Sequence, residues 1–170
     1  MTRYIALLRG VNVSGSSTLP MAALRSICAE AGFTHIETYI ASGNAVFDSR
    51  ASPAKVKAEL EARLVAHAGK PIGVITRTAA EIVTVLKANP FPQAEGRYAY
   101  AIFLDHPPPR DALDHVAGRT NVVIPLGKRE IFEHYPTGMG RSELKITAAR
   151  AGTALNMNAV AKRAEIAPME

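Results

Sequence analysis

Arg3-Tyr4-Ile5-Ala6-Leu7-Leu8-Arg9-Gly10-Val11-Asn12-Val13-Ser14-Gly15 is the stretch that decides the fold, because an apolar run leads there directly into a polar loop that contains glycine. The run from Tyr4 to Leu8 does not alternate between apolar and polar residues, which is typical of a central strand covered on both faces. Arg9 and Asn12 follow at the end of this predicted strand. We therefore expect a buried central strand and a polar site at its end.

The first half of the chain places predicted strands and helices in an order that specifies a fold. A helix that opens at Pro20 follows the first strand, and a hairpin then turns at 42–44. A second helix starts after Ser52, and a short strand covers 71–76. Strand, helix, strand, strand, helix, strand is the split βαβ order of ferredoxin-like folds, and it predicts a subdomain over 1–77.

The second half resembles the first, since residues 97–104 repeat the Arg-Tyr-then-apolar pattern of the opening strand. We predict a second α+β subdomain over 78–170 with a helical C-terminus, and a linker near 89–97. Short helices are predicted over 111–117 and 142–150. The predicted fold class is therefore α+β, with two ferredoxin-like (split βαβ) subdomains packed together.

Composition is that of an ordinary globular protein, with 48% hydrophobic and 21% charged residues. No apolar run approaches the length of about 18 residues that a membrane span requires. The single cysteine, Cys28, cannot form an internal disulfide, and the chain enters a predicted strand at Tyr4 without a signal peptide. We expect a cytoplasmic protein that makes no contact with a membrane.

The net charge of +5 is concentrated in the last third of the chain. Between Arg119 and Arg163 lie eight basic and three acidic residues, so the excess there equals that of the whole chain. A basic stretch favours an anionic partner, and nucleic acid is the alternative partner that it predicts, although the same charge also serves solubility. The third predicted strand carries Asn44 and Val46 where an RNA-recognition motif carries stacking rings, which argues against that binding mode.

Residue spacing argues against metal sites and nucleotide hydrolysis. The five histidines are nowhere paired at metal-ligand spacing and one cysteine cannot make a thiolate site, so we expect no metal and no cofactor. The loop after Arg9 has the glycine spacing of a P-loop, but Ser16 stands where the phosphate-binding lysine is needed. Backbone amides near the following helix, with Arg9 beside them, can still hold a carboxylate or a phosphate.

Six motifs follow one another over nearly the whole chain. They are Tyr4-Ile5-Ala6-Leu7-Leu8-Arg9-Gly10-Val11-Asn12-Val13, Pro20-Met21-x-x-Leu24-Arg25, Gly32-Phe33, Thr38-Tyr39-Ile40-x-Ser42-Gly43-Asn44-x-Val46-Phe47, Gly138-x-Gly140-Arg141-Ser142 and Thr153-Ala154-x-Asn156-x-Asn158. In these motifs and their order the chain resembles the bacterial domain-of-unknown-function family sixteen-ninety-seven. It departs from the family at 155–158, where the family usually has Arg-Asn-Trp-Asn, and at 16–18, where the family often has a lysine. The resemblance implies an α+β fold with ferredoxin-like subdomains, and it brings no established activity.

The polar residues of these motifs are the candidates for a ligand-binding site. They are Arg9, Asn12, Ser42, Asn44, Arg141, Ser142, Asn156 and Asn158. We expect a binding protein, or an enzyme whose reaction the sequence does not name, for a small anionic or polar ligand. A purely structural or interaction module is a third interpretation. Asn12, Asn44 and Asn156 also suit turns and helix caps, and that alternative stays open.

Arg9 anchors the predicted site. It precedes Gly10 at the end of a strand covered on both faces, so its guanidinium is expected to emerge there and to grip a carboxylate or phosphate with two hydrogen bonds. The competing interpretation is an ion pair of Arg9 with an internal carboxylate such as Glu37 or Asp48, in which case the residue serves stability.

Overall fold

The chain divides into two compact units, one that contains Met1–Glu81 and one that contains Ile82–Glu165. The computed structural model describes residues 1–10, 19–39, 43–114, 116–117, 124–136, 145–146, 149 and 152–166. The predicted subdomain boundaries, 1–77 and 78–170, stay a prediction. Residues 88–98, within the predicted linker region, form neither helix nor strand.

Helices and antiparallel sheets make up the described residues, which confirms the predicted α+β class. In chain order they are β1 (Thr2–Leu8), α1 (Met21–Glu30), β2 (Thr34–Tyr39), β3 (Asn44–Ser49), α2 (Pro53–Ala68), β4 (Val74–Thr78), α3 (Ala79–Lys87), β5 (Ala99–Phe103), β6 (Val116–Ala117), β7 (Glu130–His134), β8 (Lys145–Ile146), β9 (Thr153–Asn156) and α4 (Met157–Ile166).

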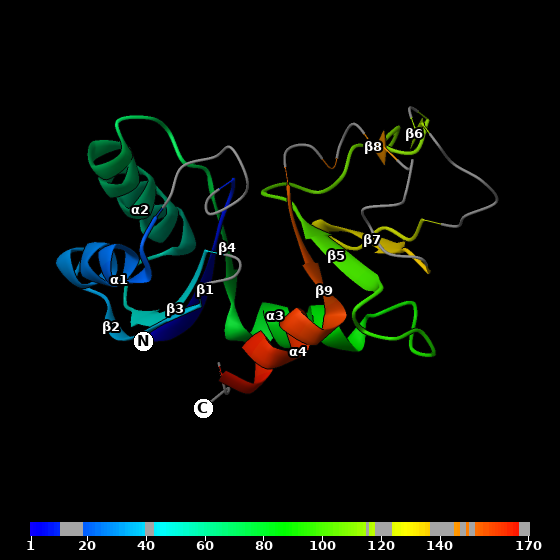
Figure 1. Ribbon diagram of the computed structural model, residues 1–170, viewed down its shortest axis with the longest axis horizontal. Helices are drawn as coiled ribbons and strands as arrows, with labels where there is room; N and C mark the ends of the chain where they lie inside the picture. The colour runs from blue at the N-terminus through cyan, green and yellow to red at the C-terminus, as the bar shows by residue number, and fades with distance from the viewer. Residues whose placement is uncertain are drawn as a thin grey trace. The chain divides into compact units, whose positions relative to one another are not determined.

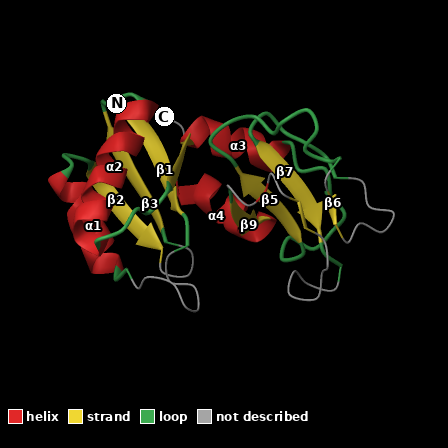
Figure 2. Cartoon of the chain, turned by 90° about the horizontal axis from the view of Figure 1, so that it is seen from above, coloured by secondary structure: helices red, strands yellow, loops and turns green. Residues whose placement is uncertain are grey.

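The first unit contains a four-stranded sheet in the order β2-β3-β1-β4. Every neighbouring pair is antiparallel, and β1 lies between β3 and β4. Helices α1 and α2 lie on the same face of this sheet, as Figures 1 and 2 show. This is the predicted split βαβ arrangement, in which β3 inserts between β1 and β2.

Strand β1 is buried on both faces, as its unbroken apolar run predicts. Tyr4, Ala6 and Leu8 point toward α1 and α2 and belong to one core cluster with helix residues such as Leu24 and Leu60. Ile5 and Leu7 point to the opposite face and are also fully buried. We call that opposite surface of the sheet the back face. By strand register it carries Arg3, Ile5, Leu7, Asn44, Val46, Asp48, Ile75 and Arg77.

Local sequence signals fix the helix ends in the first unit. The Ser52 hydroxyl accepts a hydrogen bond from the Lys55 amide at 3.3 Å, and Gly69 ends α2 with a φ of 72°. Before α3, the Thr78 hydroxyl accepts from the Glu81 amide at 3.2 Å while the Glu81 carboxylate accepts from the Thr78 amide at 3.3 Å. This reciprocal pair is a capping box.

The second unit contains an antiparallel three-stranded sheet in the order β7-β5-β9 and a two-stranded pair of β6 and β8. Figure 1 shows α4 below the larger sheet and β8 above it. Ile102, Ile131 and Ile146 form one core cluster, which packs β8 against the upper face of the sheet.

Two helices predicted in the second half are absent from the described residues. Residues 111–114 form turns and 116–117 form β6, where a helix over 111–117 was expected. Likewise 145–146 form β8 within the predicted helix 142–150. The two short strands pair with each other across about thirty residues of sequence, and Ile146 is buried by that pairing. A tertiary contact therefore overrides the local helical pattern.

None of the described helices is long and apolar enough to cross a membrane. Cys28 lies on the buried side of α1, in the core, where burial raises the pKa of its thiol to about 12. A thiol that stays protonated is a packing residue and a poor nucleophile.

Candidate functional site

The predicted site residues fall into three groups in the structure. Asn12, Ser42, Arg141 and Ser142 lie outside the described residues. Arg9 and Asn44 belong to the first unit, and Asn156 and Asn158 belong to the second.

Three chain segments meet at one end of the first sheet. The Leu8 amide donates to the Gly43 carbonyl at 3.1 Å, and the Arg9 amide donates to the Gly73 carbonyl at 2.9 Å. Gly10 and Gly43 have φ values of 65° and 59°, in the left-handed region that favours glycine. The end of β1 therefore lies between the starts of β3 and β4, where the sequence predicts a polar site.

The Arg9 side chain lies over Gly73 on the back face. A Cβ atom built on Gly73 would lie 3.3 Å from Arg9 Cδ and 3.7 Å from Arg9 Nη1. Gly73 continues the alternation of Ile75 and Arg77, so this Cβ position belongs to their face of the sheet. Because Gly73 has no side chain, the aliphatic part of the Arg9 side chain can occupy the space above it.

The Asn44 side chain lies buried on the same face and at the same end of the sheet. Asn44 is 1% exposed and pairs in register with Leu7, two residues before Arg9. Neither Oδ1 nor Nδ2 of Asn44 has a hydrogen-bond partner in the part of the chain that the structure describes. A buried polar group without a partner costs about 1–3 kcal/mol of stability, so such groups are rare in native proteins.

Arg77 adds a second guanidinium to the back face, one that the sequence did not single out. It is 1% exposed, donates from Nη1 to the Thr76 carbonyl at 3.0 Å, and has Nε 4.0 Å from Oε2 of Glu81. The predicted strand stopped at 76, whereas β4 ends two residues later, at Thr78. Alternation with Ile75 along a longer strand is the signal that would have placed Arg77 on this face.

The ion pair predicted as an alternative for Arg9 is made by Arg3 at the opposite end of β1. Arg3 Nη1 lies 3.2 Å from Oδ1 of Asp48, and Arg3 Nη2 lies 3.6 Å from Oε1 of Glu37. Arg3 also donates to the His35 carbonyl at 3.2 Å, and His35 Nδ1 lies 2.9 Å from Oδ2 of Asp48. The strand register places Glu37 and Asp48 beside Arg3, so neither of the two carboxylates named as examples pairs with Arg9, and an internal ion pair of Arg9 with another carboxylate stays a prediction.

The two asparagines of the second unit make contacts within that unit. Asn156 Oδ1 accepts from the Ala159 amide at 2.8 Å and so caps the start of α4, as the alternative interpretation predicts. Asn158 is exposed, and its side chain lies against Gly96, where any larger residue would collide with it. The binding role predicted for these two residues stays a prediction.

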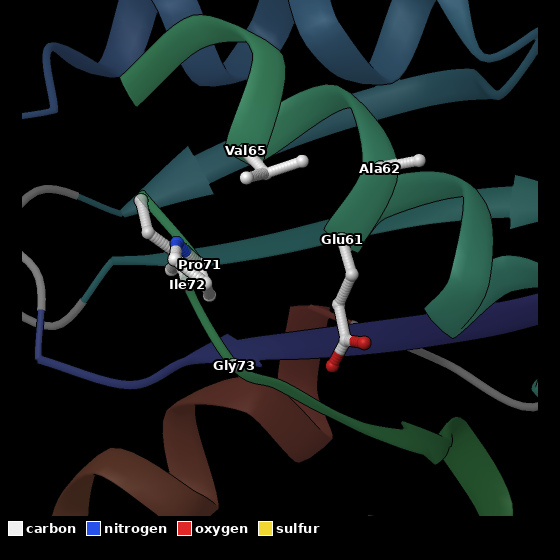
Figure 3. Close-up of a pocket in the computed structure, with 6 residues that line it drawn as sticks. All are labelled: Glu61, Ala62, Val65, Pro71, Ile72 and Gly73. Carbon is white, nitrogen blue, oxygen red and sulfur yellow. The ribbon is translucent and has the colours of Figure 1, made fainter. Parts of the chain in front are cut away.

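A surface hollow of about 350 Å³ lies beside the start of β4 in the first unit, lined by Glu61, Ala62, Val65, Pro71, Ile72 and Gly73. Figure 3 shows the Glu61 carboxylate pointing from α2 toward this strand. Its Oε1 accepts from Lys57 Nζ at 2.7 Å and from the Val74 amide at 3.1 Å. Lys57 Nζ also donates to the Val74 carbonyl at 2.6 Å. The Lys57–Glu61 ion pair therefore makes hydrogen bonds to both the amide and the carbonyl of Val74. These groups are then not available to pair with another strand at this edge of the sheet.

Among the described residues no cluster of three or more metal-ligating side chains occurs. The histidine nearest a carboxylate, His35, belongs to the Arg3 network at the other end of β1. The Arg9 end carries the Arg9 guanidinium, the Asn44 amide and backbone groups, with the Lys57–Glu61 ion pair at the adjoining start of β4; guanidinium and amide groups recognise anions and polar groups.

Comparison with known proteins identifies one family. A family model described as Protein of unknown function (DUF1697) matches residues 1–132. The chain is also similar to the solved structure of conserved bacterial protein SP0830 from Streptococcus pneumoniae, with 23% sequence identity and a TM-score of 0.81. The match covers 98% of this chain and 99% of that chain, and it shows a shared fold. A search of curated proteins found no match.

Proposed function

The chain belongs to the family whose model it matches, which assigns no activity, and we propose that it binds a small anionic or polar molecule at the Arg9 end of its first sheet. The ligand would take hydrogen bonds from the Arg9 guanidinium and from the Asn44 amide. Asn12 and Ser42, which adjoin this end in sequence, are proposed to contribute from their loops. The proposal is one of binding and assigns no reaction.

The observation that carries the proposal is the buried, unpartnered amide of Asn44. Its burial at 1% exposure costs stability unless a donor and an acceptor are supplied from outside the described chain. A polar ligand supplies both. The neighbours of Asn44 on this face, Leu7 across the strand pair and Val46 two residues on, are apolar, so an amide is not needed there for packing.

The charges on the back face favour an anionic ligand. Arg9 and Arg77 both lie on this face, whereas Glu37 and Asp48 are engaged by Arg3 at the other end. A planar guanidinium can bind a carboxylate or phosphate through two parallel hydrogen bonds. Carboxylates and phosphates are therefore the ligand classes to test first.

A thermal-shift screen of nucleotides, sugar phosphates and organic acids tests the proposal. A ligand at about 100 times its dissociation constant stabilises the wild type by about 2.7 kcal/mol. Asn44→Leu and Arg9→Ala should each reduce that shift strongly. Arg3→Ala is the matched control on the same strand and face; it should lower the melting temperature and keep the ligand-induced shift. The proposal would be contradicted if no compound stabilised any of the proteins, or if every variant showed the same ligand-induced shift.

The nucleic-acid alternative rests on the basic stretch from Arg119 to Arg163. Phosphate-backbone binding weakens steeply with salt, whereas a small-ligand pocket responds much less. An electrophoretic titration with RNA and DNA at low salt separates the two, and a flat titration removes the alternative. A cytoplasmic location is part of the same proposal, in keeping with the single buried thiol of Cys28.

A further inference from the structure

A polar row crosses the larger sheet of the second unit. Glu133 of β7 pairs in register with Tyr100 of β5, and Tyr100 pairs with Asn156 of β9. Residues paired in this way lie on one face of a sheet. Ile131 and Ile102 occupy the same face and pack against Ile146 of β8, so the row continues an apolar surface.

Glu133 is buried, and one oxygen of its carboxylate has no hydrogen-bond partner among the described residues. The residue is 2% exposed, and this oxygen is Oε2. Burial raises the pKa of this carboxyl from 4.5 to about 7 because the charged form loses its solvation. Near neutral pH, therefore, the protonated and the ionised form of Glu133 are both populated, and the ionised form is poorly solvated.

Glu130, on the same strand and the opposite face, shows that burial does not by itself leave a glutamate unpartnered. Glu130 is 6% exposed, and its Oε2 accepts from the Arg129 amide at 2.8 Å. The chain therefore donates a hydrogen bond to Glu130, whereas Oε2 of Glu133 receives none from the described residues.

Aromatic rings stand next to the Glu133 carboxylate. The Tyr100 and Tyr135 rings meet edge to face, with centroids 5.5 Å apart and an interplanar angle of 79°. Tyr135 lies two residues beyond Glu133 and so on the same face of the sheet. Tyr135 is buried, while Tyr100 is partly exposed. A carboxylate beside aromatic rings is suited to a cation, which the ring quadrupole also attracts.

We propose that Glu133, with Tyr100 beside it, forms a second binding site that takes a ligand bearing an ammonium or guanidinium group. The cation donates an N–H to Oε2 of Glu133, the atom that no described residue reaches, and its charge compensates the ionised carboxylate. Tyr100 contributes its partly exposed ring. This site lies in the second unit and is independent of the anionic site proposed at Arg9.

Methylguanidinium is the probe, and methylurea, a neutral molecule of nearly the same shape, is its matched control. The carboxyl carbon of Glu133 is followed by NMR in a pH titration of the whole chain, with and without each compound. Methylguanidinium should bind saturably and lower the Glu133 pKa, because a bound cation favours the charged form. Methylurea should leave the titration unchanged.

Variants separate this site from a general surface effect. Glu133→Gln keeps the shape and removes the charge, and it should weaken methylguanidinium binding at least tenfold, while Glu130→Gln should keep wild-type affinity. Tyr100→Leu should weaken binding severalfold. A two-dimensional NMR spectrum of each variant verifies that it is folded. The proposal is overturned by an absence of saturable binding, by equal binding of methylurea, or by wild-type affinity in folded Glu133→Gln.

Discussion

The two ends of β1 place polar side chains on the same face of the sheet in different surroundings. At one end, Arg3 contacts Asp48, Glu37 and the His35 carbonyl, so its charge is compensated within the chain. At the other end, Arg9 lies over Gly73, and the neighbouring Asn44 amide is buried without a partner among the described residues. A polar group partnered by its own chain contributes to stability. One that is buried and unpartnered costs stability, and the proposed role in binding would account for its presence.

Strand β7 repeats this contrast in the second unit. Glu130 accepts a backbone hydrogen bond, and Glu133, three residues later, has none for Oε2 among the described residues. In both units, therefore, a polar group with partners contrasts with one that has atoms without a partner among the described residues: Arg3 with Asn44 in the first unit, and Glu130 with Glu133 in the second. Each pair gives a matched set of substitutions.

The largest expected effect is the pH dependence contributed by Glu133. Its pKa of about 7 in the folded chain lies above the ordinary 4.5, so the folded state binds the proton more tightly. The free energy of unfolding should therefore fall as pH rises from about 4.5 to 7, by about 3 kcal/mol from this group. Below that range Glu133 is protonated in both the folded and the unfolded chain and adds no pH dependence. Above it the carboxyl is ionised in both states, and the free energy of unfolding falls no further. Urea denaturation of wild type and Glu133→Gln at pH 5 and pH 8 measures it.

Glu133→Gln should be more stable than wild type at pH 8 and close to it at pH 5. Glu130→Gln is the control, because it leaves Glu133 in place and should keep the wild-type fall between the two pH values. A difference between wild type and Glu133→Gln that does not change with pH would mean that Glu133 has a partner in solution.

Arg3→Ala should have the next largest effect, a loss of about 2 kcal/mol. The substitution removes the hydrogen bond to His35 and leaves Asp48, which is four-fifths buried, with the His35 ring alone. Thermal or urea unfolding measures the loss, and a variant as stable as wild type would mean that the contacts of Arg3 do not contribute to stability.

The sequence was sufficient for the fold of the first unit because each signal there is local. The unbroken apolar run from Tyr4 to Leu8 predicts a central strand, Gly43 marks the hairpin, and Ser52 marks the start of α2. The two-residue strands β6 and β8 could not be predicted in this way. They exist because distant segments pair, and two residues are too few to show a period.

The position of the candidate site could be predicted from the sequence, but only some of its residues could. Arg9 and Asn44 follow from the motif and the hairpin, whereas the partners of Arg3 depend on strand register, which sequence spacing alone does not give. Glu133 was missed for a related reason. A glutamate within a short strand suggests a solvent-facing position, and only the packing of Ile146 and Tyr135 around that face shows that it is buried.

Asn44→Leu should raise stability by about 1 kcal/mol while it removes ligand binding. Leucine has the same number of side-chain heavy atoms in the same branched arrangement, its neighbours Leu7 and Val46 are apolar, and the substitution deletes an amide that has no described partner. Urea denaturation measures the gain, and the thermal-shift screen measures the loss of the ligand response. A destabilised Asn44→Leu protein would indicate that the amide is hydrogen-bonded within the folded chain.

The smallest expected change in stability is that of Gly73→Ala, within about 0.5 kcal/mol of wild type. The new methyl group would lie 3.3 Å from Arg9 Cδ, so the flexible side chain must move by a few tenths of an ångström, and the reduced freedom of the unfolded chain offsets that cost. The consequence for binding should be larger, because the displaced atom belongs to the stem of the proposed anchor. We expect a several-fold weaker response to any ligand found in the screen. Gly69→Ala is the control: at a φ of 72° it should lower stability by about 1 kcal/mol, and it should leave the ligand response unchanged. If Gly73→Ala binds as wild type does, Arg9 reaches its ligand from a direction that does not cross Gly73, and Asn44 alone then marks the site.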